Sequence, residues 1–190
     1  MNASDHTAAD GLRAPSAFLT LPGAVAATGL DAGVPAHYGN PVAEQRALIA
    51  GAIVDLSGRG VVNVTGPDRL SWLNSLSSQQ LTGVAPGQST ETLLLGIDGR
   101  IEHAMKVLDD GVTTWLFVEA EEVDALVAWL DRMRFMLRVE VADQTDRYAT
   151  IGSLGESSAV LDAIAATPNG VALVWHDPWA SVTTGGFQYS

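Results

Sequence analysis

Few side chains in this sequence have the type and spacing that chemistry requires. His103 alternates with Met105 and Val107 on a predicted strand, so its imidazole faces apolar neighbours. Such a group needs a hydrogen-bond partner or a wet cavity, because leaving it unsatisfied costs about 1–3 kcal/mol. Three interpretations stay open: a satisfied histidine in the core or at its rim, the wall of a ligand cavity, or a general acid or base.

Arginine is concentrated in one stretch. Arg132, Arg134 and Arg138 lie close together, although the whole chain has only ten lysines and arginines. They can complement the negative end of a helix dipole and pair with nearby acids. They can also seat the anionic tail of a ligand, so both interpretations stay open.

Two further sets of side chains have polar or aromatic groups that could contact a ligand. The run Ser77, Ser78 and Gln79 follows a predicted helix, and it is either an ordinary polar loop or part of a ligand site. Four aromatic residues either belong to the core or form a stacking platform for a flat heterocycle: Trp72, Trp115, Phe117 and Phe135. We favour the core for these four, because aromatic side chains usually bury their large apolar area.

Most catalytic signatures are absent from the sequence, including HExxH, the P-loop, the G-x-S-x-G elbow and the dinucleotide fingerprint. The chain has no cysteine, which excludes disulfides, zinc–thiolate sites, iron–sulfur ligation and a thiol nucleophile within it. The histidines His37, His103 and His176 are too scattered to indicate a metal site. The residues alone therefore predict neither a catalytic group nor a metal ligand set.

The charge of the chain limits its partners. Its net charge is −12, with 22 acidic and 10 basic residues, and Lys106 is the one lysine. Nucleic acids are bound mainly by Lys and Arg on phosphates, so we expect no direct nucleic-acid binding. The first 30 residues lack the basic start of a signal peptide, and no apolar run has the roughly 18 residues of a membrane span. We expect a cytoplasmic protein without a membrane partner.

The chain divides into three parts by composition. Residues 1–36 are rich in Ala, Gly, Pro and Thr, which predicts a mobile tail to about residue 15 and then an extended arm. Residues 37–153 carry the alternating patterns of a folded domain. Residues 154–190 predict the start of a second subdomain that stops without a finishing element.

Helical and strand periodicities predict the order of elements. The predicted helices are 41–50, a helix opened by Gly66-Pro67-Asp68, 121–136 and 156–166. The predicted strands are 61–65, 93–97, 101–107, 112–118, 137–141, 147–152 and 171–175. Strand, helix, hairpin strands, helix and strand together predict an α+β fold, a ferredoxin-like antiparallel sheet with helices on one face.

Several details of these elements can be tested directly. Pro67 is predicted as the first helical residue, followed by a buried stripe of Leu70, Leu73 and Leu76 with Trp72 at its edge. In the meander, Leu93, Leu95 and Ile97 are predicted to lie on one face of a strand. Asp98-Gly99 predicts a two-residue type I′ turn, because both positions tolerate positive φ.

Short motifs follow one another over roughly residues 37–153: His37-Tyr38-Gly39 with Glu44, Asp55-Leu56-Ser57, Val64-Thr65-Gly66-x-Asp68, Trp72-Leu73-x-x-Leu76 and Gly99-x-Ile101. Their order resembles the T-protein (aminomethyltransferase) superfamily of folate-binding proteins, particularly its YgfZ-type branch. Each motif is only moderately specific, so their joint order and spacing carry the resemblance.

The chain departs from the superfamily at two places. Aminomethyltransferases carry an acidic pair after the hairpin glycine, one member of which assists transfer at the folate nitrogen. His103-Ala104 stand there in this sequence, as in the YgfZ-type branch, which also lacks the pair. The Lys-Gly-Cys signature of that branch is missing too, so the resemblance implies the N-terminal part of a longer protein that carries a partner half.

The resemblance implies a tetrahydrofolate-binding accessory protein, similar to those implicated in iron–sulfur cluster assembly or repair and in tRNA modification. Folate is then the ligand, with His103, Ser77, Ser78, Gln79 and Trp115 as cofactor-binding residues, and iron–sulfur proteins are the expected partners. The arginine stretch would seat the folate glutamate. Two alternatives stay open: an aminomethyltransferase of the glycine cleavage system, and a ferredoxin-like association module without a ligand.

Overall fold

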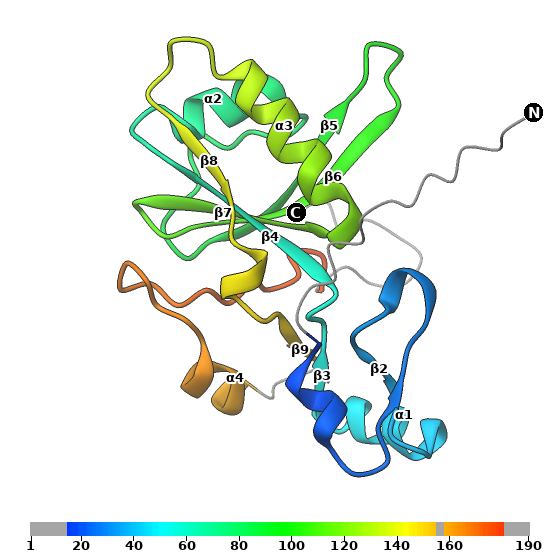
Figure 1. The fold of residues 1–190 in the computed structure, drawn as a ribbon. Coiled ribbons are helices and arrows are strands. Elements are labelled where there is room, and N and C mark those ends of the chain that lie inside the picture. Colours follow the sequence, from blue (N-terminus) through cyan, green and yellow to red (C-terminus); the bar gives the residue numbers. More distant parts are fainter. Residues whose placement is uncertain (1–14, 155–157, 181–190) are drawn as a thin grey trace, which may run out of the picture. The chain divides into compact units, whose positions relative to one another are not determined.

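The computed structural model describes residues 15–154 and 158–180. These residues divide into two compact units (Figure 1). Of the described residues, one unit contains 15–58 together with Thr150–Leu154, and the other contains Arg59–Ala149 and 158–180. The predicted division at residues 36 and 153 stays a prediction for the whole protein.

The first unit is built from short elements. They are η1 Ala17–Thr20, β1 Val25–Ala26, η2 Gly29–Asp31, β2 Pro35–His37, α1 Pro41–Ile49, β3 Ile53–Asp55 and β9 Ile151–Ser153. β1 pairs with β2 and β3 pairs with β9, both antiparallel. The described part of the predicted extended arm is therefore folded into turns and a strand pair, and residues 1–14 of the predicted tail lie outside the described residues.

Helix α1 begins at Pro41, as the sequence predicts. Asn40 Oδ1 accepts a hydrogen bond from the Ala43 backbone N–H at 3.1 Å. Glu44 Oε1 accepts one from each of the Tyr38 and Asn40 backbone N–H groups, both at 2.9 Å. Side-chain oxygens thus satisfy N–H groups at and before the first helical turn, which have no partner within a helix. Tyr38 and Glu44, which carry part of the family resemblance, hold the chain as it enters the helix.

The second unit contains the main sheet. Its elements are β4 Arg59–Thr65, α2 Arg69–Leu76, β5 Ser89–Leu95, β6 Ile101–Asp109, β7 Thr113–Glu119, η3 Ala120–Glu122, α3 Val123–Met133, β8 Glu140–Asp143, η4 Thr145–Arg147 and α4 Ser158–Ile164. Five strands form the sheet in the order β5-β6-β7-β4-β8, and every neighbouring pair is antiparallel. Helices α2 and α3 cover the same face (Figure 1). The predicted α+β fold with an antiparallel sheet is confirmed.

Side chains alternate along the central strands between two cores. The larger core lies under the helices and joins Leu73 of α2, Val107 of β6 and Leu126 of α3. The smaller core lies on the opposite face, where Val61, Leu108 and Trp115 pack with Phe117, Tyr148 and Leu173. The central strands β4, β6 and β7 therefore contribute to both cores, and neighbouring residues in their sequence face opposite sides of the sheet.

Helix α2 differs in two details from the prediction. It begins at Arg69, so Pro67 lies in the preceding turn and is not the first helical residue. Trp72 is buried beside Leu73 and is not at the edge of the apolar stripe. Its indole Nε1 donates to the Met133 carbonyl oxygen at 3.2 Å, which satisfies the polar end of a side chain that would otherwise stay at the surface.

The β5–β6 hairpin contains a bulge that the sequence pattern did not reveal. Leu94 pairs with His103 but Leu95 pairs with Ile101, so the register shifts between them. The alternation of Leu93, Leu95 and Ile97 does not mark the core side, because Leu94 is buried whereas Leu95 and Ile97 are exposed, and β5 ends at Leu95, before Ile97. The predicted type I′ turn was wrong: the tip spans Gly96–Arg100, and only Gly99 in its Asp98-Gly99 pair has a positive φ, of 78°.

The chain after α4 is irregular where a strand was predicted. Residues 171–175 form no strand. Trp175 Nε1 donates to the Thr90 carbonyl oxygen at 2.9 Å, and the His176 backbone N–H donates to Ser89 Oγ at 2.9 Å. Side-chain contacts to β5 therefore replace a strand pairing there. Among the described residues, no helix has the length and apolar character that crossing a membrane would need.

Candidate functional site

His103 lies on β6, on the face covered by the helices. Its side chain is 11% exposed, and Nδ1 lies 3.4 Å from Glu122 Oε2 just before α3. Alternation along β6 places Met105 and Val107, both buried, on the same face. The imidazole thus has the polar partner that its position requires and sits at the rim of the larger core. When Nδ1 carries the proton toward Glu122, Nε2 is left as an acceptor.

The predicted polar residues after α2 continue the edge of the sheet beside β5. The Ser78 backbone N–H donates to the Leu93 carbonyl at 2.9 Å, and Ser78 Oγ accepts from the Leu93 N–H at 3.1 Å. The Gln79 N–H donates to Thr92 Oγ1 at 3.2 Å. Ser77 Oγ donates back into α2, to the Leu73 carbonyl at 2.8 Å. The hydroxyls thus hold local structure, and the exposed amide of Gln79 is the group most free to meet a ligand.

Trp115 lies on the opposite face from His103. It is 3% exposed, its Nε1 donates to Asp110 Oδ2 at 2.8 Å, and its ring meets Tyr148 edge-on at a centroid distance of 5.1 Å. The structure therefore brings Ser78, Gln79 and His103 to the two sides of β5, and it does not bring Trp115 to them.

The expectation that the four aromatic residues belong to the core is confirmed for three of them. Trp72 and Trp115 are buried, and Phe117 is half-buried against the smaller core. The expectation was wrong for Phe135, which is 80% exposed just after α3. The chain turns there with a positive φ of 46° and directs the residue away from the helix-covered core.

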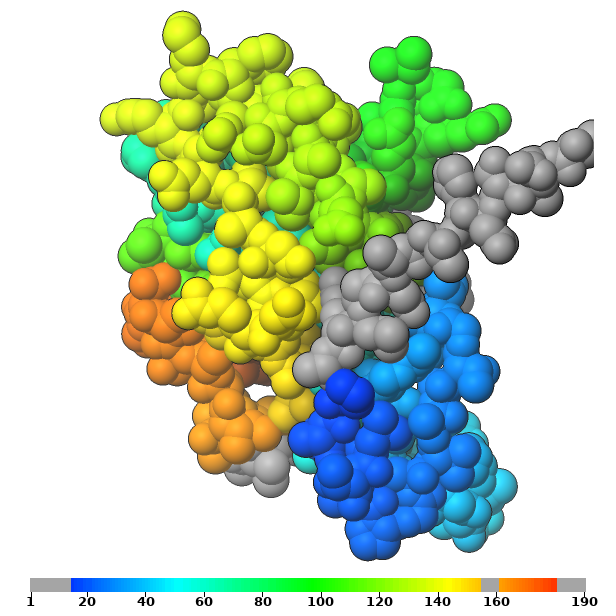
Figure 2. Space-filling view, viewed as in Figure 1, coloured from blue at the N-terminus to red at the C-terminus, as the bar shows by residue number. Residues whose placement is uncertain are grey.

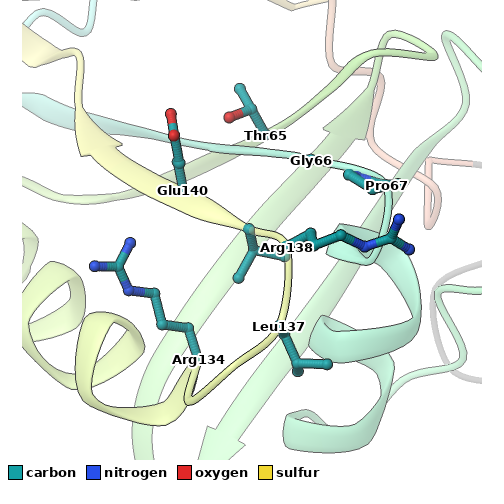
Figure 3. A pocket seen from close by; sticks show the side chains of 8 residues that line it. Thr65, Gly66, Pro67, Arg134, Leu137, Arg138 and Glu140 are labelled. Carbon is teal, nitrogen blue, oxygen red and sulfur yellow. The ribbon is translucent and has the colours of Figure 1, made fainter.

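A depression of about 500 Å³ lies where β4 ends and β8 begins (Figure 3). It is lined by Thr65, Gly66, Pro67, Arg134, Leu137, Arg138, Val139 and Glu140. Arg134 Nε lies 3.1 Å from Asp131 Oδ1, and Arg138 donates to the two carboxylate oxygens of Asp68 at 2.9 and 3.1 Å. Figure 3 shows the two guanidinium groups extending to opposite sides.

The predicted pairing of the arginines with nearby acids is confirmed for Arg134 and Arg138. Hydrogen bonds from Arg138 lower the pKa of Asp68 below its ordinary value. Arg134 and Arg138 pair with Asp131 and Asp68, and Glu140 lines the same depression, so these five side chains carry a net charge of −1. A seat for the folate glutamate here stays a prediction, and it would have to compete with these carboxylates.

Sequence reasoning missed a pair of buried carboxylates, because Asp109-Asp110-Gly111 reads as a simple turn. Asp109 is 1% exposed and binds Arg69 through two hydrogen bonds of 2.8 Å. Asp110 is 3% exposed and accepts hydrogen bonds from Trp115, Asn169 and two backbone N–H groups, at 2.7–3.0 Å. The available signal was two acids directly after the apolar pair Val107-Leu108. These groups fasten the β6–β7 turn to α2 and to the segment near residue 169.

Acid is expected to weaken the second unit through Asp110. Burial raises the pKa of Asp110, but hydrogen bonds from Trp115, Asn169 and two backbone N–H groups outweigh burial and lower the pKa below 3.8. The ionised form therefore contributes stability that is complete above pH about 4 and is lost as the pH falls through the lowered pKa. Below pH 4, we expect the urea concentration at the unfolding midpoint, measured by tryptophan fluorescence, to decrease as the pH falls. This decrease with pH should be less steep in Asp110→Asn. Equal slopes would contradict this role.

Comparison with known proteins places the fold and the motifs in one family. Residues 22–173 match the family model described as the GCVT N-terminal domain. The chain is 29% identical over 119 residues to the aminomethyltransferase of Lysinibacillus sphaericus, covering 60% of the chain and 32% of that protein. It is 25% identical over 130 residues to the aminomethyltransferase of Bacillus subtilis, covering 67% and 36%. The chain thus spans about a third of the length of these relatives.

A solved structure shares the fold. The glycine cleavage system aminomethyltransferase T from Bartonella henselae matches 74% of this chain and 40% of its own, with a TM-score of 0.65 and 19% identity. The family match extends beyond residues 37–153 on both sides and covers most of the chain. The chain therefore belongs to the GCVT N-terminal domain family of the aminomethyltransferase superfamily.

Proposed function

We propose that this chain supplies part of a tetrahydrofolate-binding site in a protein that carries out aminomethyl transfer. The observation that carries the proposal is the family match over residues 22–173, together with curated relatives that are named aminomethyltransferases. Tetrahydrofolate supplies a nucleophilic nitrogen that accepts a one-carbon unit. Because the chain spans about a third of those relatives, the rest of the site belongs to other parts of the protein.

The residues of this chain fit the polar edge of a pterin in part. His103 with Glu122, and the amide of Gln79, stand at the two sides of β5 and offer hydrogen-bonding groups. Glu122 orients the imidazole through Nδ1, which leaves Nε2 as the ring nitrogen that would hydrogen-bond the ligand. Trp115 does not fit the role of stacking surface for the same ligand, because it is buried on the other face.

A second candidate is the YgfZ-type accessory role, with iron–sulfur proteins as partners. His103 and its partner Glu122 favour it, because the family resemblance assigns an acidic pair to the position where His103-Ala104 stand. An imidazole at that position can orient folate without supplying the carboxylate of the transfer reaction. The ligand is shared by both candidates, so folate binding is tested first and the reaction second.

Calorimetric titration of tetrahydrofolate into the full-length protein tests the shared step. We expect binding, and we expect His103→Gln to raise the dissociation constant about tenfold, the equivalent of about 1.4 kcal/mol. Val112→Ser, at an exposed position in the β6–β7 turn, serves as the control and should not change it. Absence of binding would leave an association module, and binding unaffected by His103→Gln would remove His103 from the site.

An aminomethylated lipoyl carrier then separates the two candidates. Aminomethyl transfer predicts that the full-length protein forms methylenetetrahydrofolate, releases ammonia and leaves the lipoyl carrier in its dithiol form, at a rate that falls in His103→Gln. The accessory role predicts folate binding without this turnover. Binding with no product over many equivalents of carrier would therefore overturn aminomethyl transfer and favour the second candidate.

A further inference from the structure

The connection between α3 and β8 exposes three apolar side chains in a row. Phe135 is 80% exposed, Met136 is 98% exposed and Leu137 is 44% exposed. Residues 135–137 are called the apolar loop below. In Figure 2 the yellow-green atoms of the α3 region form part of the surface of the second unit. Exposed apolar residues are unremarkable when scattered, but contiguous ones mark interaction sites.

The apolar loop is held in place from both ends. Trp72 Nε1 donates to the Met133 carbonyl at 3.2 Å, and the Leu137 N–H donates to the Arg134 carbonyl at 2.9 Å. Beyond the loop, Asp68 accepts from the Arg138 backbone N–H at 3.0 Å and from its guanidinium. A loop that is already ordered loses less entropy on binding than a floppy one.

Phe135 has a conformation that costs free energy. Its φ of 46° makes it the one non-glycine residue with positive φ among the described parts of the chain. A bulky side chain rarely adopts this backbone region, and such outliers concentrate at functional sites. Phe135 lies just after the C-cap of α3, where helices often have glycine because the backbone takes a positive φ there. The chain leaves the helix axis at this residue.

The charge around the loop differs from that of the rest of the molecule. Residues 131–138 contain one aspartate and three arginines, a net charge of +2, which leaves −14 for the remainder of the chain. Even with the nearby Asp68 and Glu140 included, the neighbourhood is neutral. Arg132 is exposed, and its side chain makes no hydrogen bond or ion pair with residues 15–154 or 158–180.

We propose that the apolar loop docks a partner protein that presents an apolar pocket bordered by carboxylates. Phe135 and Met136 would fill the pocket, while Arg132 and Arg134 would meet the acidic border; aromatic residues, Met and Arg are the types enriched in protein interfaces. A compact acidic border suits the apolar loop and its arginines, since charges are screened beyond about 8 Å. An extended anionic surface such as a membrane would also face the strongly acidic remainder of the chain. The proposal does not rest on folate binding, although Arg134 and Leu137 also line the depression predicted to seat the folate glutamate.

Selection of short random peptides displayed on phage, with the full-length protein as target, tests the proposal. We expect enriched peptides that combine a large apolar residue with Asp or Glu. Calorimetry with a synthetic copy of one such peptide should give an affinity that falls about tenfold or more in F135N/M136S, and also in R132Q/R134Q. Asparagine suits positive φ, so the first variant keeps the loop conformation. Val112→Ser removes an exposed apolar side chain elsewhere and should leave the affinity unchanged.

Four outcomes would overturn the proposal. The selection could enrich no peptide, or only basic or neutral ones. The enriched peptide could bind the loop variants as tightly as the parent protein. Vesicles of phosphatidylglycerol could bind the parent protein but not F135N/M136S, which would make the loop a membrane contact. Finally, light scattering could show a self-associated parent protein that F135N/M136S converts to monomers, which would make the partner a second copy.

Discussion

Replacing Gly66 with alanine is expected to destabilise the second unit by about 2–5 kcal/mol, from left-handed strain together with steric overlap. Gly66 has a φ of 106° where the chain leaves β4 for α2. A Cβ atom there would lie 2.0 Å from the Arg138 carbonyl oxygen. The Arg138 backbone cannot move away freely, because its N–H is bound to Asp68. The methyl group of the alanine would therefore push the end of β4 away from the segment that leads into β8.

Gly99→Ala is the matched control for this prediction. Gly99 also has a positive φ, of 78°, but nothing lies within 4 Å of its Cβ position. Only the backbone strain remains there, about 1–2 kcal/mol. The readout is tryptophan fluorescence in urea, which reports on the second unit because all five tryptophans belong to it: Trp72, Trp115, Trp129, Trp175 and Trp179. Equal midpoints for the two variants would refute the close packing of Gly66 on Arg138.

Asp109→Asn is expected to cost about 3–5 kcal/mol, because it leaves a buried cation without its counter-charge. The Arg69 and Asp109 side chains are 12% and 1% exposed and share two hydrogen bonds of 2.8 Å. Asp109 also accepts from Thr114 Oγ1 at 2.6 Å and from the Gly111 N–H at 2.8 Å. An amide in the same place would direct a donor toward other donors.

Two further variants test whether the lost charge pair causes the effect. Asp131→Asn breaks the exposed pair with Arg134 and should barely change the urea midpoint, because exposed ion pairs contribute little. The double variant R69M/D109L removes both charges and should recover much of the loss in Asp109→Asn. If Asp109→Asn unfolds at the same urea concentration as Asp131→Asn, the buried pair does not stabilise the unit.

Elements whose signals are local were predicted well from the sequence. Helix α1 starts at Pro41 because its cap is made by residues a few positions away, at Asn40 and Glu44. Helix α3 buries Val123 and Leu126, as the helical spacing of its apolar residues indicates. The family, too, could be inferred from short motifs whose order survives in the chain.

The faces of β5 could not be predicted in the same way. A one-residue shift in a strand moves every side chain to the other side of the sheet. Residues Ser89–Leu94 pair with β6 in continuous register and place Leu94 on the buried face, so Leu94 is buried where Leu93 and Leu95 were expected. Nothing in the alternation of leucines distinguishes the two registers.

The candidate site illustrates the same division. By itself, the sequence determined most elements of the main sheet, the superfamily and the polar character of His103 and Gln79, because these depend on residue type and nearby neighbours. Only the tertiary structure decided that His103 meets Glu122, that Trp115 lies on the other face, and that Asp109 is buried against Arg69, 40 residues away. Such contacts depend on strand register and on packing between distant segments, which no local pattern of residues specifies.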